Sequence, residues 1–579
     1  MRVTNKMIMN NAASNINTTK EVVNKRNKQM TTQKRIDVPS DDPVIAVRSL
    51  RLSTTLSQVT QYYGKNIPDA NSWLDVTETA LINMRDIMAD CKTLATTGAQ
   101  DTYNEEDRST LITQLESLQK QIFAEGNSDY AGRTVFTGYR TNSNLTFTED
   151  EANTKYRIDQ CINISDALEE YRYYSGSVTV PTTLDEVADT DAISDISETD
   201  LYRVRLAYDS IDSINSIMVR TNEKYNETSG LSESDTIGTF DFTNDTRAFS
   251  YTNDPDNGTT AALSGMADKA DGTSYDGDYT ITVFESEEEW RDHMTDSVKN
   301  VTGNEIYIIR DIGQMVFSAE VSEAFRNSNV TLEIQYDKTG FAEGELRPEY
   351  YYNCEKIAVT DPADTSVAWN DDETQSKTIV YDKFAKVQNQ SGDTVTGNTI
   401  NYDIQYTVSA NQTININTEA STVFDSSIQR DMTEMITAVQ WTIDAHKKYD
   451  RIQSMMSEGQ YDDEETQNYL KEWLAAAKKE CDFFEDNMQK LFSTELGKID
   501  EYYDTISVRI TDLGCKVDSL NLTKTRVGDQ QETVQELQSK NDDVELSQII
   551  IDYTAAYTAY QASLTAASKL GQSTLLNYL

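Results

Sequence analysis

The chain has 579 residues, of which only 37% are hydrophobic. Its 97 acidic residues outnumber its 51 basic residues, which gives a formal net charge of -46 at pH 7. Such a charge repels nucleic acid and anionic lipid, so we expect no nucleic-acid partner and no membrane partner. The sequence contains no apolar run long enough to span a bilayer and no apolar core of a secretory signal peptide, which excludes both segments from our expectations.

The first predicted element is an assembly helix within residues 1–40. Its apolar residues recur seven apart on an otherwise polar surface, which indicates a narrow coiled-coil seam. The seam residues are Met9, Ile16, Val23 and Met30. A loop follows, in which we expect Asp42 to cap the next helix while Pro43 occupies its first turn.

Residues 41–150 are predicted to continue as helix and to form the N-terminal part of a helical rod. Apolar residues at mixed spacings of three and four define one stripe. We expect this stripe to pack the rod through Leu74, Leu81, Met84 and Met88. We expect this helix to end at Gly98 and a further helix to carry Leu111 to Ile122. Residues 132–140 are expected to form a short β-like piece.

Residues 151–425 differ in character, because Asp, Thr, Asn, Gly and Tyr become frequent and short β-prone runs recur. We interpret this stretch as an inserted, mixed but β-rich outer region, with a division near residue 225. The runs are Tyr279 to Phe284, Ile306 to Ile309, Val330 to Tyr336, Thr378 to Tyr381 and the alternating Ile400 to Val408. Two helices are also expected, at Leu201 to Val219 and at Glu287 to Lys299.

Helix is predicted again after Asp425, as the C-terminal part of the rod (426–540) and a C-terminal assembly helix (541–579). Both segments carry seams that step four and three. The rod seam is Ile506, Ile510, Leu513, Val517, Leu520, Val527 and Val534. The assembly seam is Leu546, Ile550, Tyr553, Tyr557, Tyr560 and Leu564. A phase slip near Leu537 indicates a stutter or a break between two helices.

A lone helix with a thin seam gains little stability in water, so the two ends of the chain are expected to pack on each other and then on neighbouring subunits. The fold class is therefore α+β, with long terminal helices in an antiparallel coiled-coil or helical-bundle rod and an inserted β-rich outer domain. The narrower interpretation, in which the 506–534 seam serves only an intramolecular bundle, stays open.

Several strings resemble the flagellin superfamily. Residues 30–36 followed by Pro39-Ser40-Asp41-Asp42-Pro43 look like its N-terminal signature, and Gly132 to Tyr139 is similar to a string of its hook–filament junction branch. Residues 542–546, 560–564 and 575–579 resemble the shared C-terminal pattern and the junction branch's terminus. One departure is Gln33, which stands where the family usually has glycine. The resemblance covers about 1–145 and 425–579 and does not extend to the middle region.

The resemblance implies a structural adaptor of the bacterial flagellum that joins the hook to the flagellin filament and is located outside the cell. Its implied partners are further copies of itself in a ring or helical array, an adjacent hook-associated protein, flagellin, and a cytosolic export chaperone at the C-terminal helix. It also implies type III export without a cleaved signal peptide. Two alternatives remain: a filament-forming flagellin, or a flagellin-like scaffold that displays a binding domain at 226–425.

No constellation in the sequence points to catalysis, so we expect no enzyme, no cofactor and no metal site. Neither His293 nor His446 has a second histidine nearby, and neither acid run, 287–289 or 462–465, has the spacing of a calcium loop. The tyrosine clusters at 171–174 and 350–352 are interpreted as sheet packing rather than a sugar platform. The five scattered cysteines do not form a disulfide framework.

Overall fold

The computed structural model describes residues 5–99, 105–193, 197–221, 224–226, 231–233, 236–242, 258–267, 269, 272–296, 303–358, 378–389, 392–400 and 402–572. The chain divides into two compact units. Unit 1 comprises residues 1–72, 405–416 and 514–579, and unit 2 comprises residues 73–404 and 417–513. The expected C-terminal string 575–579 lies outside the described residues.

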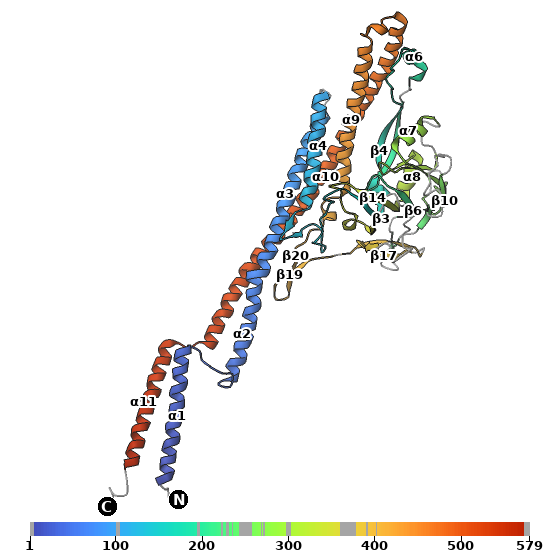
Figure 1. The fold of residues 1–579 in the computed structure, drawn as a ribbon. Coiled ribbons are helices and arrows are strands. Elements are labelled where there is room, and N and C mark those ends of the chain that lie inside the picture. The colour runs from blue at the N-terminus through green and yellow to red at the C-terminus, as the bar shows by residue number, and fades with distance from the viewer. Residues whose placement is uncertain are drawn as a thin grey trace, which may run out of the picture. The chain divides into compact units, whose positions relative to one another are not determined.

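Unit 1 is mainly helical. Its elements are α1 (Asn5–Thr32), α2 (Pro43–Gln61), a π-helical turn (Tyr62–Asn66), the start of α3 (Ile67–Gly98), the end of α10 (Glu464–Asp542), α11 (Leu546–Gln572) and the hairpin strands β19 (Gln405–Ser409) and β20 (Gln412–Asn415). Figure 1 shows α1 and α11 side by side. The hairpin comes from the expected insertion yet clusters with these helices: Asn66 Nδ2 donates to Thr407 O at 2.7 Å, and Tyr406 hydrogen-bonds Asp69.

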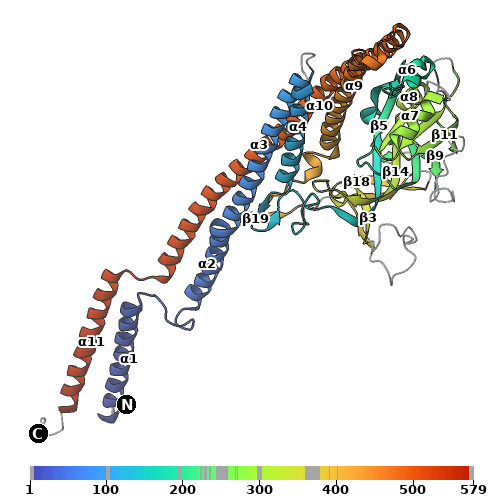
Figure 2. The ribbon, with the colours of Figure 1, turned by 45° about the horizontal axis from the view of Figure 1, so that its top comes forward.

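The helices of unit 2 are α3, α4 (Glu105–Gly126), α9 (Ser426–Met455) and α10, with the short α5 (Ile164–Ala167), α6 (Leu184–Ala188), α7 (Glu287–Asp296) and α8 (Ala319–Asn327). In Figure 2, α9 and α10 run alongside each other. Phe492 packs where a Cβ on Gly98 would collide with it, at 2.5 Å, so glycine at the end of α3 permits a close helix contact. Among the described residues, no helix is both long enough and apolar enough to cross a bilayer.

Two six-stranded sheets make up most of the rest of unit 2. The first has the order β10-β11-β12-β13-β5-β4 and the second β16-β15-β3-β14-β6-β9. The first consists of β4 (Glu169–Ser175), β5 (Ser197–Arg205), β10 (Thr259–Leu263), β11 (Gly277–Phe284), β12 (Glu305–Ile309) and β13 (Gln314–Phe317). The second consists of β3 (Glu151–Asn163), β6 (Ser213–Thr221), β9 (Thr236–Asp241), β14 (Val330–Phe341), β15 (Asn353–Ala358) and β16 (Thr378–Tyr381).

Four short strands pair as hairpins: β1 (Asp129–Tyr130) with β2 (Arg133–Thr134) and β17 (Phe384–Gln388) with β18 (Thr394–Thr399). Strands β7 (Lys224–Asn226) and β8 (Leu231–Glu233) form another pair. The two large sheets share one apolar core, to which α8 adds Val321 and Phe325. Trp290 of α7 lies in a second cluster with Tyr173 and Tyr307, so β4 and β12 contribute apolar residues to that cluster. The α+β class is confirmed.

The expected helix at Leu201–Val219 is wrong, because this stretch forms β5 and β6. Its apolar residues imitate helical spacing, but Ser210 turns the chain with φ 49°, and strands β13 and β14 supply the pairing partners. The expected helix at 287–299 is present as Glu287–Asp296, and its last three residues lie outside the described ones.

The predicted alternating strand Ile400–Val408 is also wrong in its first half. Residues 402–404 are irregular, Asn401 lies outside the described residues, and only β19 is strand. The side chain of Asn417 explains the difference: its Oδ1 accepts from Ile404 N at 3.0 Å, and its Nδ2 donates to Tyr402 O at 3.2 Å. A side-chain amide therefore satisfies backbone groups that a strand would have paired.

Helix does not persist unbroken after Asp425. Helix α9 ends at Met455, and α10 begins at Glu464 behind Asp463, which caps it by accepting from Glu465 N and Thr466 N at 3.1 and 3.0 Å. Two residues of the acid run 462–465 thus start a helix with carboxylates at its positive end. The second break falls at 543–545, between α10 and α11.

Candidate assembly surface and a buried ion-pair network

Helices α1 and α11 pack antiparallel in unit 1. Thr19 Oγ1 and Ser563 Oγ lie 3.2 Å apart, and Arg26 Nη2 lies 3.4 Å from Asp552 Oδ2. The residue number rises in α1 as it falls in α11, which fixes the direction. The half-buried residues of α1 step four and three through Ala12, Ile16, Thr19, Val23, Arg26 and Met30. Because Thr19 and Arg26 are polar, only four of these six seam residues are apolar.

The predicted C-terminal seam divides between two environments. Tyr553 and Tyr560 are half-buried, at helical spacing from the buried Ile549 and from the half-buried Ala556, Ser563 and Ala567. The other predicted members stay exposed: Leu546, Ile550, Tyr557 and Leu564. At the N-terminal end, Met9 is likewise exposed beside Met7 and Ile8. The helix pair thus leaves a second apolar stripe exposed to water, in which Leu546 and Ile550 are four residues apart and Ile550, Tyr557 and Leu564 are seven apart.

Ile549 is the residue that sequence reasoning missed. It is 1% exposed, whereas its neighbour Ile550 is 46% exposed. The run Ile549-Ile550-Ile551 contains three isoleucines, any of which could belong to the seam that is buried within the chain. Counting back four residues from Tyr553 selects Ile549 for the intramolecular seam, and this count is the signal that could have found it.

The predicted rod residues are buried or half-buried. In unit 2 these are Leu74, Leu81, Met84, Met88, Ile506, Ile510 and Leu513, and in unit 1 they are Val517, Leu520, Val527 and Val534. Of these, only Ile510 and Val517 are half-buried. Leu522 and Leu537 remain exposed on α10, outside the predicted seam.

The segment that follows α1 is hydrogen-bonded to the segment that joins α10 to α11. Arg35 N donates to Asp542 O at 2.7 Å, and Val544 N donates to Gln33 O at 3.0 Å. The Lys34 ammonium lies 2.5 Å from the Asp543 carboxylate, and this hydrogen bond lowers the pKa of Asp543. Asp42 caps α2, accepting from Val44 N and Ile45 N at 3.0 and 3.2 Å, and Pro43 occupies the first turn.

Gln33, the departure from the family pattern, has φ 58°. Because a left-handed conformation costs a non-glycine residue about 1 kcal/mol, we expect Gln33→Gly to stabilise the α1–α11 pair by up to about that amount. Amide hydrogen exchange in α1 should slow accordingly. The control Asn24→Gly, at an exposed position inside α1, should speed exchange, since glycine costs about 1 kcal/mol in a helix. Faster exchange in Gln33→Gly would contradict the expectation.

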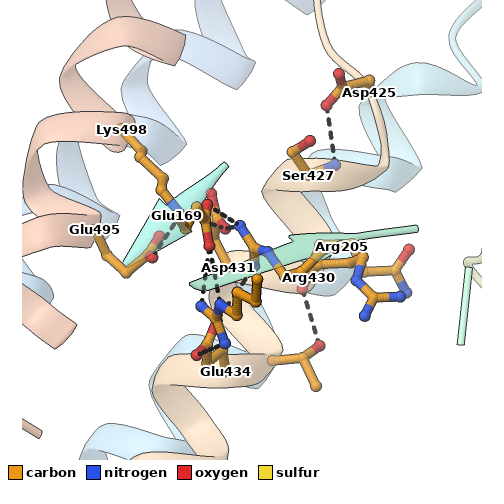
Figure 3. A network of polar contacts seen from close by, with 12 residues as sticks. Glu169, Arg205, Asp425, Ser427, Arg430, Asp431, Glu434, Glu495 and Lys498 are labelled. Carbon is orange, nitrogen blue, oxygen red and sulfur yellow. Dashed lines mark hydrogen bonds and ion pairs between the residues drawn. The ribbon is translucent and has the colours of Figure 1, made fainter. Parts of the chain in front are cut away.

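A buried network of charged side chains joins the first sheet to α9 and α10 in unit 2 (Figure 3). Its acids are Glu169 on β4, Asp431 and Glu434 on α9, and Glu495 on α10; its bases are Arg203 and Arg205 on β5 and Lys498 on α10. Arg203 Nη1 lies 2.7 Å from Glu434 and Lys498 Nζ 2.5 Å from Glu169. Arg205 contacts Glu169, Asp431 and Glu434, and Tyr502 donates to Asp431 at 2.6 Å.

The surroundings shift the pKa values of two of these carboxyl groups, on Glu169 and Glu495, in opposite directions. Burial alone would raise the pKa of Glu169, but the Arg205 and Arg203 guanidinium groups and the Lys498 ammonium outweigh it and lower that pKa to about 2. Burial raises the pKa of Glu495 to about 8; the Asp431 carboxylate adds to this effect, while Lys498 and Arg205 oppose it. The network therefore holds one carboxyl group with a lowered pKa and one with a raised pKa.

The lowered pKa of Glu169 predicts that the stability of unit 2 falls at acidic pH. A carboxylate with a lowered pKa in the folded state stabilises above its unfolded pKa and loses that contribution as pH falls through the folded value. For Glu169 the loss should occur between its ordinary value of 4.5 and about 2. We expect the urea midpoint of unit 2 to fall across this window and the fall to be smaller in Glu169→Gln. Identical profiles for the two proteins would contradict the assignment.

The other polar candidates are engaged in packing. His446 Nε2 lies 2.8 Å from Glu485, which also pairs with Arg108 at 2.9 Å, and His293 packs its ring against Tyr307. Tyr173, Tyr350 and Tyr351 are buried. No group of three residues that could hold a metal ion occurs in the part of the chain that the structure describes.

The N-terminal quarter of the chain matches a known family. Residues 3–141 match the bacterial flagellin N-terminal helical region. This match agrees with the expectation that the chain is not an enzyme.

Two curated relatives carry a more particular name. The chain is 29% identical over 142 residues to flagellar hook-associated protein 3 of Salmonella typhimurium, covering 24% of this chain and 44% of the relative. It is 26% identical over 177 residues to the protein of that name from Escherichia coli, covering 30% of this chain and 53% of the relative. The chain thus spans about half the length of the curated relatives it matches. The chain is therefore similar in part to two proteins named flagellar hook-associated protein 3.

Two solved structures are also similar. Hook associated protein-3 of Legionella pneumophila matches with a TM-score of 0.29 and 10% identity, covering 84% of this chain and 97% of that one. A hook-associated protein of Vibrio parahaemolyticus matches with a TM-score of 0.18 and 28% identity, covering 19% and 50%.

Proposed function

We propose that this chain is an adaptor subunit of the bacterial flagellum that joins the hook to the flagellin filament. In this proposal it acts outside the cell and assembles through α1 and α11. The observation that carries the proposal is the exposed apolar stripe of Leu546, Ile550, Tyr557 and Leu564, which the α1–α11 pair leaves uncovered. The relatives' name, hook-associated protein 3, agrees with this role.

The stripe favours contact between subunits for a physical reason. Burial of apolar surface contributes about 25 cal/mol per Å², and isolated helix pairs expose such surface at a cost. A stripe whose members are four or seven residues apart matches the groove of another helix. Neighbouring copies in a ring or helical array, an adjacent hook-associated protein and flagellin are therefore the proposed occupants. Before export, a cytosolic chaperone would cover the C-terminal helix in the same way.

Deletion of the gene in its own bacterium tests this role. Loss of a junction protein should leave hooks without filaments and release monomeric flagellin into the medium, whereas loss of a filament-forming flagellin should leave intact junctions and no flagellin. A truncation that lacks residues 9–30 and 546–570 should fail to restore filaments. Normal incorporation of that truncated chain into flagella, measured by electron microscopy with a labelled chain, would contradict the proposal.

A further inference from the structure

Helix α1 is basic, whereas the chain as a whole is acidic. It contains one acid, Glu21, and five bases, namely Lys6, Lys20, Lys25, Arg26 and Lys28. The rest of the chain holds 96 acids and 46 bases. The charge of α1 is therefore opposite in sign to that of the remaining chain, and a basic helix attracts acidic surfaces.

The intramolecular partner of α1 does not neutralise this charge. Helix α11 contains a single acid, Asp552, which lies 3.4 Å from Arg26, and a single base, Lys569. Lys28 lies 3.2 Å from Asp37, which follows α1 in the chain. Two other lysines of α1 are exposed and form no ion pair with any described residue, namely Lys6 and Lys20. The α1–α11 pair thus leaves both ammonium groups available for another contact.

A matching pair of acids lies on α3. Asp75 and Asp90 are exposed, and neither forms an ion pair with any described residue. Ideal helix geometry places them about 22 Å apart along the axis and about 60° apart around it. The same geometry places Lys6 and Lys20 about 21 Å and about 40° apart. The two lysines can therefore face the two aspartates when α1 of one copy lies along α3 of another.

We propose that the basic face of α1 docks on α3 of a second copy of this chain, where Lys6 and Lys20 pair with Asp75 and Asp90. This inference rests on the proposed function, because it names a partner surface within the assembly. The complementary charges set the orientation and speed the encounter of the two copies. Met7 and Met9, which are exposed beside Lys6, supply apolar surface for the same contact.

Carbodiimide cross-linking of the full-length chain tests this contact, because the reagent joins an amine to a carboxyl group only where the two touch. Isotope-labelled and unlabelled chains are mixed, so a cross-linked peptide pair that carries both labels comes from two copies. We expect such mixed-label pairs to join Lys6 or Lys20 to Asp75 or Asp90 at about 10 mM salt, and to fall about fivefold at about 1 M salt, which screens exposed charges. Absence of these pairs, or a yield that salt does not change, would overturn the proposal.

A charge exchange between two variants locates the contact. One variant carries Lys6→Glu and Lys20→Glu, and the other carries Asp75→Lys and Asp90→Lys. Because all four positions are exposed, both variants should fold. When the two are mixed, we expect cross-links between the exchanged positions at a yield close to that of the wild type. Absence of these cross-links would refute the pairing of α1 with α3.

A matched control uses two exposed lysines of α10. The variant Lys471→Glu, Lys478→Glu has the same change of charge as the α1 variant. Mixed with the Asp75→Lys, Asp90→Lys chain, it should give no cross-link from positions 471 or 478 to positions 75 or 90. Cross-links as abundant as those of the α1 variant would show that any added acid suffices, which contradicts a specific contact.

Flotation with phosphatidylglycerol vesicles tests the other kind of surface that a basic helix binds. Vesicle binding that Lys6→Glu, Lys20→Glu abolishes, together with absence of mixed-label pairs, would assign α1 to a lipid surface and overturn the proposal. The result is separable from that of the gene deletion. If the deletion gives the junction phenotype but no mixed-label pairs form, this contact is wrong and the adaptor role stands. If the pairs form but the deletion leaves normal filaments, the contact stands and the adaptor role is wrong.

Discussion

Replacing Ile550 with aspartate is expected to abolish incorporation into flagella while leaving the folded monomer unchanged. Ile550 is exposed on α11 and belongs to the stripe proposed to contact neighbouring copies. A charge there must be buried without a partner in every subunit contact, which costs several kcal/mol each time. In the monomer the same side chain stays in water, so its effect on stability should remain within about 0.5 kcal/mol. Incorporation is measured by immunoblot of purified hook–filament complexes, and stability by circular dichroism.

Two further variants separate assembly from folding. Ile549→Ala, at the adjacent buried position, should destabilise the α1–α11 pair by about 2–4 kcal/mol, because it removes a packed side chain. Ala555→Asp adds the same charge as Ile550→Asp at an exposed position about 140° further round the helix and should incorporate normally. If Ile550→Asp incorporates as well as Ala555→Asp, the exposed stripe is not the assembly surface.

The terminal helices could be predicted because their signal is local. Seven-residue spacing in Met9–Met30 and four–three spacing in Leu546–Leu564 depend only on helix geometry, and the caps at Asp42 and Pro43 on neighbouring residues. The spacing could not decide which side of α11 faces α1, since Ile549 and Ile550 are chemically identical. That choice depends on the partner helix, which periodicity does not contain.

The secondary structure of the insertion was harder to predict, because it too depends on partners that are distant in the sequence. Leu201, Val204, Tyr208 and Ile211 are spaced as in a helix, but the pairing of β5 and β6 with distant strands overrode that local preference. The ion-pair network was not predicted at all. Its only local signals are Arg203-x-Arg205 and the pairs Asp431/Glu434 and Glu495/Lys498, each three apart, and many solvated helices share such spacing.

Arg205→Ala is expected to destabilise unit 2 by about 3–5 kcal/mol, because removal of one partner leaves buried carboxylates without compensation. Arg205 contacts Glu169, Glu434 and Asp431, and the Asp431 side chain is 1% exposed. Lysine should restore only part of the loss, since it has no planar fork to serve three carboxylates. Urea unfolding followed by tryptophan fluorescence measures the change. Arg172→Ala, which breaks the more exposed pairs with Glu198 and Asp200, is the control and should cost less than about 1 kcal/mol.

Removing charges of both signs distinguishes a buried charge network from simple packing. The triple variant Arg205→Met, Glu169→Gln, Asp431→Asn deletes the cation together with two of its partners, so no additional carboxylate is left uncompensated. Well-packed neutral replacements of buried ion pairs are often neutral in stability, and we therefore expect this variant to regain most of what Arg205→Ala loses. If the triple variant is as unstable as Arg205→Ala, uncompensated buried charge is not what destabilises Arg205→Ala, and the electrostatic account of this network is wrong.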